Sequence, residues 1–492
     1  MSISWGAASN AVSEHPHTEA ASLYEAHKKV YPRAVFGRFR RLKWAVMGLC
    51  LAFFYLAPLL RWQRGTGAPD QAILIDLAGR RVYLFDLEFW PQEIYFVTGI
   101  MVLAMLALFL ATALFGRVWC GYACPQTVWT DLFVMVEQWI EGDRMERIRL
   151  DRGPWTVKKL GKKLLKHGIW LGIALASGCA FIGWYTDAPT LTRKLLEFQA
   201  PLIDVGFIAL LTSTTYLLGG LAREQVCTYM CPWPRIQSAL LDEHSRVVSY
   251  QAWRGEPRGK LADADAGDCI DCLACVQVCP TGIDIRDGHQ LQCIDCSLCV
   301  DACDAMMLKV GRAPGLIAWE SFTGQKQRAA GQPAEWRPIR PRTVLYATIF
   351  LIVSAAMLIA LAMRQPLKAT VLHDRMPLYV TISGDRLRNG YMLKIINKTR
   401  KPQILMLTAE GPPGLVLAIA GEKEGGGGNN LLLTAEPDGQ TSFHVTAALP
   451  KEAVSAASTA LTFLLSSPDY PEMRVIDHFF APEPHLSEEK SP

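Results

Sequence analysis

The sequence predicts a mixed fold: an α-helical membrane domain with five spans, an inserted cysteine-rich domain, and a C-terminal all-β sandwich. Three observations predict it. Half of the 492 residues are hydrophobic, and the mean hydropathy is +0.15. Twelve of the 14 cysteines fall in short motifs. After residue 363 the chain changes to short β-rich segments that are separated by turn signals.

Five apolar segments are long enough, or nearly so, to cross a hydrocarbon core of about 30 Å as helices. We expect them at residues 44–60, 94–115, 168–185, 202–219 and 343–363. Lysine and arginine are concentrated before the first segment and between the second and third. By the positive-inside rule this predicts a cytoplasmic N-terminus and, after five spans, an external C-terminus. The net charge of +4 predicts no nucleic-acid partner.

The predicted spans divide the chain into five parts. Residues 1–43 form a cytoplasmic tail, of which 1–23 are polar, lack the apolar core of a secretory signal and are expected to be disordered. Residues 44–219 form a four-helix membrane domain, and 220–342 form a cytoplasmic segment. Residues 343–363 are the fifth helix. Residues 364–492 are the outer β-domain with its tail.

Two cysteine runs in the cytoplasmic segment share the spacing C-x2-C-x2-C-x3-C, within a small domain expected at about 268–309. This spacing is the bacterial ferredoxin pattern for two 4Fe-4S clusters, in which the fourth cysteine of each run ligates the other cluster. The pattern predicts one cluster on Cys269, Cys272, Cys275 and Cys303, and the other on Cys293, Cys296, Cys299 and Cys279. Asp304 replaces the proline expected after the second run. A zinc site or a disulfide framework fits two matched runs in the cytoplasm less well.

Two further motifs read C-x-Y-x-C-P and follow the second and fourth spans. They contain Cys120, Cys124, Cys227 and Cys231. The repeat predicts a pseudo-twofold pair that could bring four thiols together, and the spacing of four places both thiols of a pair on one face if the segment is helical. The thiols could hold Cu(I) or another cluster, cycle between dithiol and disulfide, or be buried as small hydrophobes. Met230 could add a thioether, whereas Cys50 and Cys179 inside spans are expected to be small hydrophobes.

The outer domain is expected to be a small β-sandwich without cysteine. Its strands are predicted at 391–399, 403–410, 415–420, 442–449, 461–467 and 473–480. A domain outside the cytoplasm without such clusters suits docking or scaffolding better than catalysis. Four histidines there are expected to be structural or surface residues: His373, His444, His478 and His485.

These motifs, in this order, resemble the cytochrome c oxidase accessory proteins called CcoG, FixG or RdxA. The likeness covers residues 31–480 approximately. It rests on 116–144 and 224–245 around the paired motifs, on RGEPRGK, on both ferredoxin runs, and on HDRMPLYV and YMLKIINKT in the outer domain.

The resemblance implies a multi-pass protein of the bacterial inner membrane with a periplasmic immunoglobulin-like domain. It implies a cupric reductase that converts Cu(II) to Cu(I) for assembly of cbb(3)-type oxidases. The eight run cysteines would be redox ligands, and Cys120, Cys124, Cys227 and Cys231 copper or redox thiols. Its partners would be a cytoplasmic electron donor, a copper transporter or chaperone, and oxidase assembly factors, and a homodimer is a further hypothesis.

Two rival interpretations stay open at this point. Membrane proteins of the NapH type resemble this chain in their cysteine pairs and ferredoxin runs, and they oxidise quinol. Alternatively, the chain is an assembly scaffold whose redox-inert clusters only stabilise its fold. Quinol oxidation without copper dependence would favour the first rival, and normal oxidase assembly without clusters would favour the second.

Overall fold

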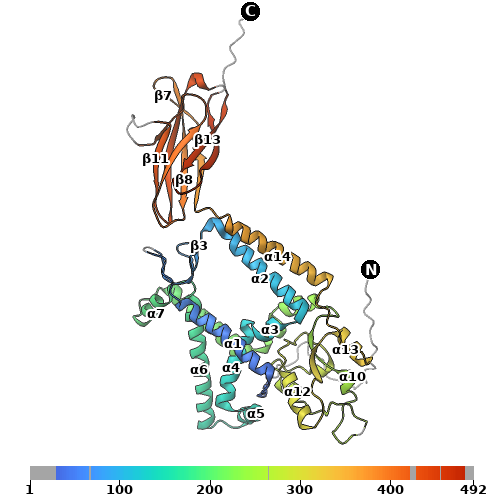
Figure 1. The fold of residues 1–492 in the computed structure, drawn as a ribbon. Coiled ribbons are helices and arrows are strands. Elements are labelled where there is room, and N and C mark those ends of the chain that lie inside the picture. The colour runs from blue at the N-terminus through green and yellow to red at the C-terminus, as the bar shows by residue number, and fades with distance from the viewer. Residues whose placement is uncertain (1–28, 66–67, 264, 422–427, 455, 483–492) are drawn as a thin grey trace, which may run out of the picture. The chain divides into compact units, whose positions relative to one another are not determined.

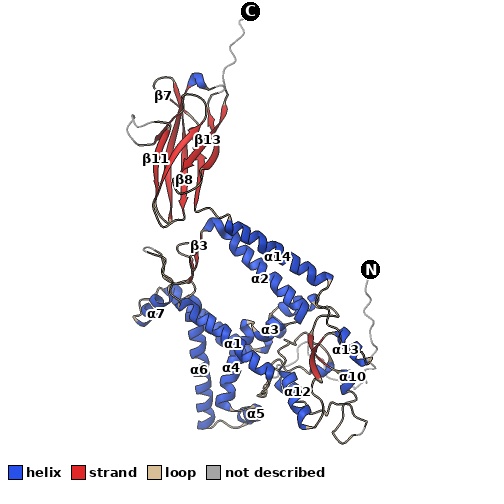
Figure 2. Cartoon of the chain, in the orientation of Figure 1, coloured by secondary structure: helices blue, strands red, loops and turns tan. Residues whose placement is uncertain are grey.

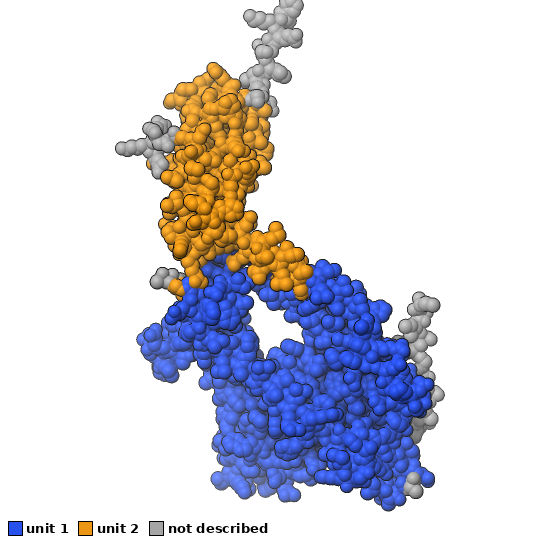
Figure 3. Space-filling model, in the orientation of Figure 1, with its two compact units in different colours: residues 1–64, 69–353 blue, residues 65–68, 354–492 orange. Residues whose placement is uncertain are grey.

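The computed structural model describes residues 29–65, 68–263, 265–421, 428–454 and 456–482 (Figure 1). The predicted disorder at residues 1–23 and the position of His485 therefore lie outside the described residues. Two compact units make up the chain, one of residues 1–64 with 69–353 and one of residues 65–68 with 354–492 (Figure 3). Each unit is described by itself below.

Five helices of the described residues are long and apolar enough to cross a membrane, which confirms the predicted number of spans. They are α1 (Arg38–Leu56), α2 (Ile94–Phe115), α6 (Val157–Ile182), α8 (Leu202–Thr215) and α14 (Pro341–Ala362). Short turns extend three of these spans: η1 (Ala57–Leu59) after α1, η2 (Pro91–Glu93) before α2, and the π-helix η3 (Tyr216–Ala222) after α8. Helices α6 and α8 pack closely, because a Cβ at Gly178 would lie 2.8 Å from the carbonyl oxygen of Ile208.

Helix α6 begins eleven residues earlier than predicted, so the expected start at residue 168 is wrong. Thr156 caps this helix by accepting a hydrogen bond from the backbone of Lys159. The lysines that follow suggested a loop, but the fold gives the ammonium groups of Lys159 and Lys166 partners. Lys159 donates to the carbonyl oxygen of Gly153 at 2.7 Å, and Lys166 lies 2.9 Å from the carboxylate of Glu141.

The connections between the spans contain further elements, most of them short. A three-stranded antiparallel sheet joins α1 to α2, with β2 in the middle. Strands of three or four residues carry too little alternation to be recognised in a sequence. The elements are β1 (Ile73–Asp76), β2 (Arg81–Leu84), β3 (Leu87–Phe89), α3 (Val118–Tyr122), α4 (Pro125–Glu141), α5 (Arg144–Arg152) and α7 (Ala188–Leu196).

The segment between α8 and α14 folds as short helices around the two cysteine runs. Strands β4 (Val247–Tyr250) and β5 (Ile317–Glu320) form an antiparallel pair beside them. Cysteines of both runs share an apolar core with Val248, Val300 and Met307. The helices are η4 (Val226–Met230), α9 (Trp233–Leu240), α10 (Ala252–Gly255), α11 (Ala274–Val278), η5 (Ile285–Asp287), α12 (Leu298–Lys309) and α13 (Phe322–Ala329).

The second unit contains the predicted β-sandwich (Figure 2). One sheet has the order β10-β12-β8-β6, with β7 also paired to β8, and the other has the order β11-β9-β13-β14. Buried side chains from both sheets, including Tyr391, Leu405 and Phe463, fill the space between them. The strands are β6 (Leu367–His373), β7 (Val380–Ile382), β8 (Arg386–Asn397), β9 (Gln403–Glu410), β10 (Val416–Ile419), β11 (Asn430–Ala435), β12 (Gly439–Pro450), β13 (Ser458–Ser466) and β14 (Met473–Phe480).

The histidines of the sandwich make ordinary side-chain contacts. His373 packs edge-on against the ring of Tyr391, and His444 lies 2.6 Å from the carboxylate of Asp374. His478 contacts Ser458 at 3.2 Å.

Candidate functional site

The eight cysteines of the two runs line two small cavities in the first unit. Cys269, Cys272, Cys275 and Cys303 line one that encloses about 340 Å³. The other encloses about 360 Å³ and is lined by Cys279, Cys293, Cys296 and Cys299, with Cys275 also on its wall. The fourth cysteine of each run thus lies with the first three of the other run. This is the grouping that the ferredoxin spacing predicts, and the assignment of each ligand stays a prediction.

Burial makes several of these thiols hard to ionise without a metal. It raises the pKa of Cys275 to about 11, that of Cys303 to about 12, and that of Cys293 and Cys299 well above the usual value. Thiols with such pKa values stay protonated at neutral pH unless a cation compensates the thiolate charge. The iron of a 4Fe-4S cluster supplies that charge, so both cysteine groups fit such clusters.

The backbone of the two runs repeats one strained conformation. Asp271 and Leu273 in the first run have φ of 53° and 56°, and Asp295 and Ser297 in the second have 52° and 61°. Left-handed backbone costs roughly 1–2 kcal/mol at a non-glycine residue. Because both runs keep it at the same positions, it belongs to the way in which the chain wraps each cavity rather than to a chance turn.

The two C-x-Y-x-C-P motifs meet in space, as the repeat predicts. Burial, followed by the neighbouring thiols of Cys124 and Cys227, raises the pKa of Cys120 to about 12. Cys231 contributes to the same shift. Burial, followed by Cys124 and Cys231, also raises the pKa of Cys227 to about 12. The four thiols therefore lie close enough to interact electrostatically, although their motifs are more than 100 residues apart in the sequence.

The two thiols of a pair do not lie on one helix, so the condition under which they would share a helical face is not met. Helix α3 ends at Tyr122, and Cys124 is extended, with φ −59° and ψ 129°. The π-helix η4 ends at Met230, and Cys231 is likewise extended. A proline follows each of these cysteines, and it disfavours helical backbone at the residue before it.

Helix α3 packs directly on the loop of the second cysteine run. Cys120 shares an apolar cluster with Ile294 and Cys296. Gly121 allows the close approach, because a Cβ there would lie 2.7 Å from the carbonyl oxygen of Ile294. The first paired motif is therefore in contact with the residues that line the second cavity.

Arg117 joins three parts of the site. Its backbone N–H donates to a carboxylate oxygen of Asp295 at 2.9 Å. Its guanidinium donates to the carbonyl oxygens of Cys293 at 3.0 Å and Pro234 at 2.8 Å, and also to that of Leu291. The side chain is 1% exposed. Arg117 thus fixes the first motif to the second cysteine run and to the residues that follow the second motif.

Gln237 is a second buried group that links the motifs. It lies on α9, which follows the second motif, and is fully buried. The Cys120 thiol donates to its Oε1 at 3.2 Å, and its Nε2 donates to the hydroxyl of Thr112 at 3.3 Å. Neither Arg117 nor Gln237 was predicted from the sequence. In the sequence, the two residues are marked only by being polar and by lying within six positions of a motif cysteine.

A buried ion network holds the helices behind the motifs. Glu137 on α4 lies 3.2 Å from Arg147, 3.4 Å from Lys166 and 2.9 Å from Arg223. Burial alone would raise the pKa of Glu137, but Arg223, Lys166 and Arg147 outweigh it and hold that pKa at about 2. Arg223 directly follows η3 and stands four residues before Cys227 of the second motif. The network therefore ties α4, which follows the first motif, to the chain that enters the second.

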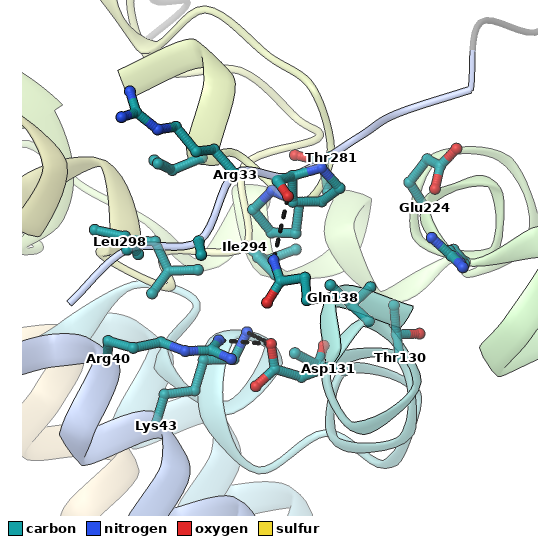
Figure 4. Close-up of a pocket in the computed structure, with 18 of the residues that line it drawn as sticks. Arg33, Arg40, Lys43, Thr130, Asp131, Gln138, Glu224, Thr281, Ile294 and Leu298 are labelled. Carbon is teal, nitrogen blue, oxygen red and sulfur yellow. Dashed lines mark hydrogen bonds and ion pairs between the residues drawn. The ribbon is translucent and has the colours of Figure 1, made fainter. Parts of the chain in front are cut away.

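A cavity with polar and apolar residues on its wall lies between Cys227 and the loop after Cys279 and encloses about 790 Å³ (Figure 4). Asp131 lines it and pairs with Arg40 at 2.7 Å and Lys43 at 3.6 Å. Burial raises the pKa of Asp131, but Lys43 and Arg40 lower it more, so the carboxyl stays ionised. Its other oxygen, Oδ2, is buried and has no hydrogen-bond partner. The cavity wall thus contains a buried carboxylate oxygen without a hydrogen-bond partner, beside two cations.

Comparison with known families adds three matches. A 4Fe-4S dicluster domain matches residues 222–322, and a 4Fe-4S binding domain matches residues 97–144. Residues 357–482 match the immunoglobulin-like fold at the C-terminal end of FixG, which that family description names as a candidate oxidoreductase.

Relatives match over most of the chain. "Nitrogen fixation protein FixG" of Rhizobium meliloti (strain 1021) is 46% identical over 485 residues, which cover 92% of each chain. "Protein RdxB" of Cereibacter sphaeroides is 49% identical and covers 82% of this chain and 87% of its own. "Protein RdxA" of the same organism is 45% identical and covers 92% and 96%. A crystal structure of a FixG-related protein from Vibrio parahaemolyticus is 19% identical over 24% of this chain and 99% of its own, with a TM-score of 0.21.

Proposed function

The chain belongs to the family of FixG, RdxA and RdxB, and from this premise we propose that it is a membrane-bound oxidoreductase that reduces Cu(II) to Cu(I). The Cu(I) would serve the assembly of a cbb(3)-type cytochrome c oxidase. Bound at the two cysteine runs, 4Fe-4S clusters supply one-electron chemistry. Each Cu(II) ion, as substrate, takes up one electron and becomes Cu(I).

One observation carries the proposal: the thiols of the paired motifs lie directly against the second cysteine run. Cys120 packs with Cys296, and Arg117 bonds to the carbonyl oxygen of Cys293. An electron on the second run would therefore leave through Cys120, Cys124, Cys227 and Cys231. Cys272 of the first run is exposed, which gives a cytoplasmic donor access to the other end of the route.

Soft sulfur groups support copper as the substrate. Thiolate and thioether ligands prefer Cu(I), whereas carboxylates and water suit harder ions. The two motifs bring four thiols together, and Met230 between Cys227 and Cys231 presents an exposed thioether. Sulfur ligands at the point where the electron leaves the protein would bind Cu(I), the product, more strongly than Cu(II), the substrate.

The test is Cu(II) reduction by the chemically reduced, purified chain, followed with a Cu(I)-specific chelator under anaerobic conditions. We expect one Cu(I) per electron stored, and a loss of at least tenfold in rate in the Cys293→Ser variant. Cys50→Ser, inside α1, is the matched control and should reduce copper normally. Normal copper reduction in a variant without all eight run cysteines would contradict the proposal.

The cavity of Figure 4 favours one second candidate, a carrier that oxidises quinol. Asp131 Oδ2 would accept a hydroxyl hydrogen, and Arg40 and Lys43 would stabilise the oxygen of the oxidised ring. Each quinol would release two electrons to the clusters and two protons to the cytoplasm. Asp131→Asn separates the two candidates. It should abolish quinol-driven cluster reduction and leave copper reduction by chemically reduced protein unchanged.

A further inference from the structure

Four converging thiols can hold either one metal ion or a cluster, and the spacing of their sulfurs distinguishes the two. An ion with metal–sulfur bonds of about 2.3 Å holds four sulfurs only about 3.8 Å apart. We compared the side-chain atoms that can bind a metal: cysteine sulfurs, histidine ring nitrogens and carboxylate oxygens. Among the described residues, three such atoms lie within 4.8 Å of one another only in His289, Cys293 and Asp295. No three sulfurs of the paired motifs are that close. Their spacing is too wide for three or four of them to bind one ion together.

The cysteine runs provide an internal standard for this spacing. The runs lie in the segment that matches a 4Fe-4S dicluster domain. In the described chain, no three of their sulfurs lie within 4.8 Å of one another either. The reason is that each thiolate of a cluster binds a different iron, so the ligands stand apart from each other. The four motif thiols share the wide spacing of the eight predicted cluster ligands.

The local backbone of the motifs repeats that of a cluster-binding run. Cys275 to Pro280 also reads C-x3-C-P, and Cys279 has φ −66° and ψ 123°. Cys231 has −82° and 123°, close to these values. The proline explains the extended cysteine. The proline does not explain the helix before it, however. In each of the three C-x3-C-P segments the first cysteine lies in a five-residue helix, namely α11, α3 or η4.

A separate observation comes from the family match at residues 97–144. It describes a 4Fe-4S binding domain, and Cys120 and Cys124 are the only cysteines in that range. Two cysteines cannot complete a cluster of four irons with one thiolate each. The partners that the fold brings to them are Cys227 and Cys231.

From these observations we propose that Cys120, Cys124, Cys227 and Cys231 hold a third 4Fe-4S cluster. Arg117, three residues before Cys120 and buried, provides a cation beside this anionic centre. The inference rests on the proposed function only in that it concerns the same four thiols. Copper is then reduced as a substrate next to the cluster, and the exposed thioether of Met230 is the soft group left to meet it.

The test counts iron and acid-labile sulfide in the full chain, purified anaerobically, with Mössbauer and EPR spectra. We expect about twelve irons per chain in the wild type and about eight in Cys124→Ser and in Cys227→Ser, since each cluster contributes four. The same spectral component should vanish in both variants, although their motifs are far apart in sequence. Cys179→Ser, inside α6, is the control and should keep about twelve irons.

The outcomes separate this inference from the proposed function. A wild-type chain with about eight irons, and with copper bound to sulfur as a single ion by X-ray absorption, overturns the third cluster even if the chain reduces Cu(II). A chain with about twelve irons that fails to reduce Cu(II) keeps the third cluster and overturns the proposed function. The wild-type count decides the matter even if both serine variants fail to fold.

Discussion

The eight cysteines of the two runs and the four of the paired motifs are brought together in different ways. The eight lie within the 35 residues from Cys269 to Cys303 and rely on two short helices and a repeated left-handed turn. The four lie in motifs that begin at Cys120 and Cys227, 107 positions apart. Membrane helices and buried polar side chains hold them together. The first site is encoded locally, whereas the second depends on the tertiary fold.

This difference means that substitutions outside any motif should damage the second site and spare the first. Arg117, Gln237 and the network around Glu137 are the residues that position the paired motifs. Substitutions at these residues therefore test that separation.

Glu137→Gln should have the largest effect, because it leaves Arg147, Lys166 and Arg223 without their shared carboxylate. Removing one partner of a buried ion pair typically costs about 4 kcal/mol. We expect a loss of that size in the free energy of unfolding, measured by denaturant titration in detergent. Glu146→Gln on the exposed side of α5 is the matched control and should cost under about 0.5 kcal/mol. Equal losses in both variants would contradict the role of the network.

Acid should weaken the same network. The pKa of Glu137 is about 2 in the folded chain against its usual 4.5, so its contribution is present above pH 4.5. The contribution is lost as the pH falls from 4.5 through 2, by about 3 kcal/mol for a shift of this size. The wild type should therefore approach the unfolding free energy of Glu137→Gln on acidification. A constant difference between the two from pH 6 to pH 2.5 would show that Glu137 is not the group responsible.

Arg117→Leu should cost about 2 kcal/mol, because it leaves buried carbonyl oxygens without a donor. We expect the spectrum of the two run clusters to persist and electron transfer to copper to slow by at least tenfold. Anaerobic EPR and the Cu(I) chelator assay measure these two properties in one preparation. Arg149→Leu, an exposed arginine on α5, is the control. Loss of the run clusters together with unchanged copper reduction would contradict this prediction.

Gln237→Leu should have the smallest effect, about 1 kcal/mol, since it removes one neutral hydrogen-bond partner from Cys120 and one from Thr112. Gln237→Glu keeps an acceptor for the thiol and should recover part of the loss. Thermal unfolding followed by tryptophan fluorescence compares the two variants with the wild type. A larger loss in Gln237→Glu than in Gln237→Leu would show that the contact to Cys120 is not the one that matters.

The same contrast explains what the sequence could predict. Spacing alone grouped Cys303 with the first run and Cys279 with the second, because the ferredoxin pattern is local. The five spans and the β-sandwich followed from apolar runs and from alternation. The early start of α6 did not, because Lys159 and Lys166 find their hydrogen-bond and ion-pair partners only in the folded chain. The roles of Arg117 and Gln237 did not follow from the sequence either, because their hydrogen-bond partners lie more than 100 positions away.

The most direct test of the central claim is rapid mixing of chemically reduced, copper-free protein with one equivalent of Cu(II), with cluster absorbance and Cu(I) formation recorded together. The account predicts that the run clusters are oxidised as Cu(I) appears, one electron for each ion. In a variant with Cys120, Cys124, Cys227 and Cys231 all replaced by serine, the run clusters should stay reduced. Oxidation of the run clusters by Cu(II) at the wild-type rate in that variant would contradict the claim that electrons leave through the paired motifs.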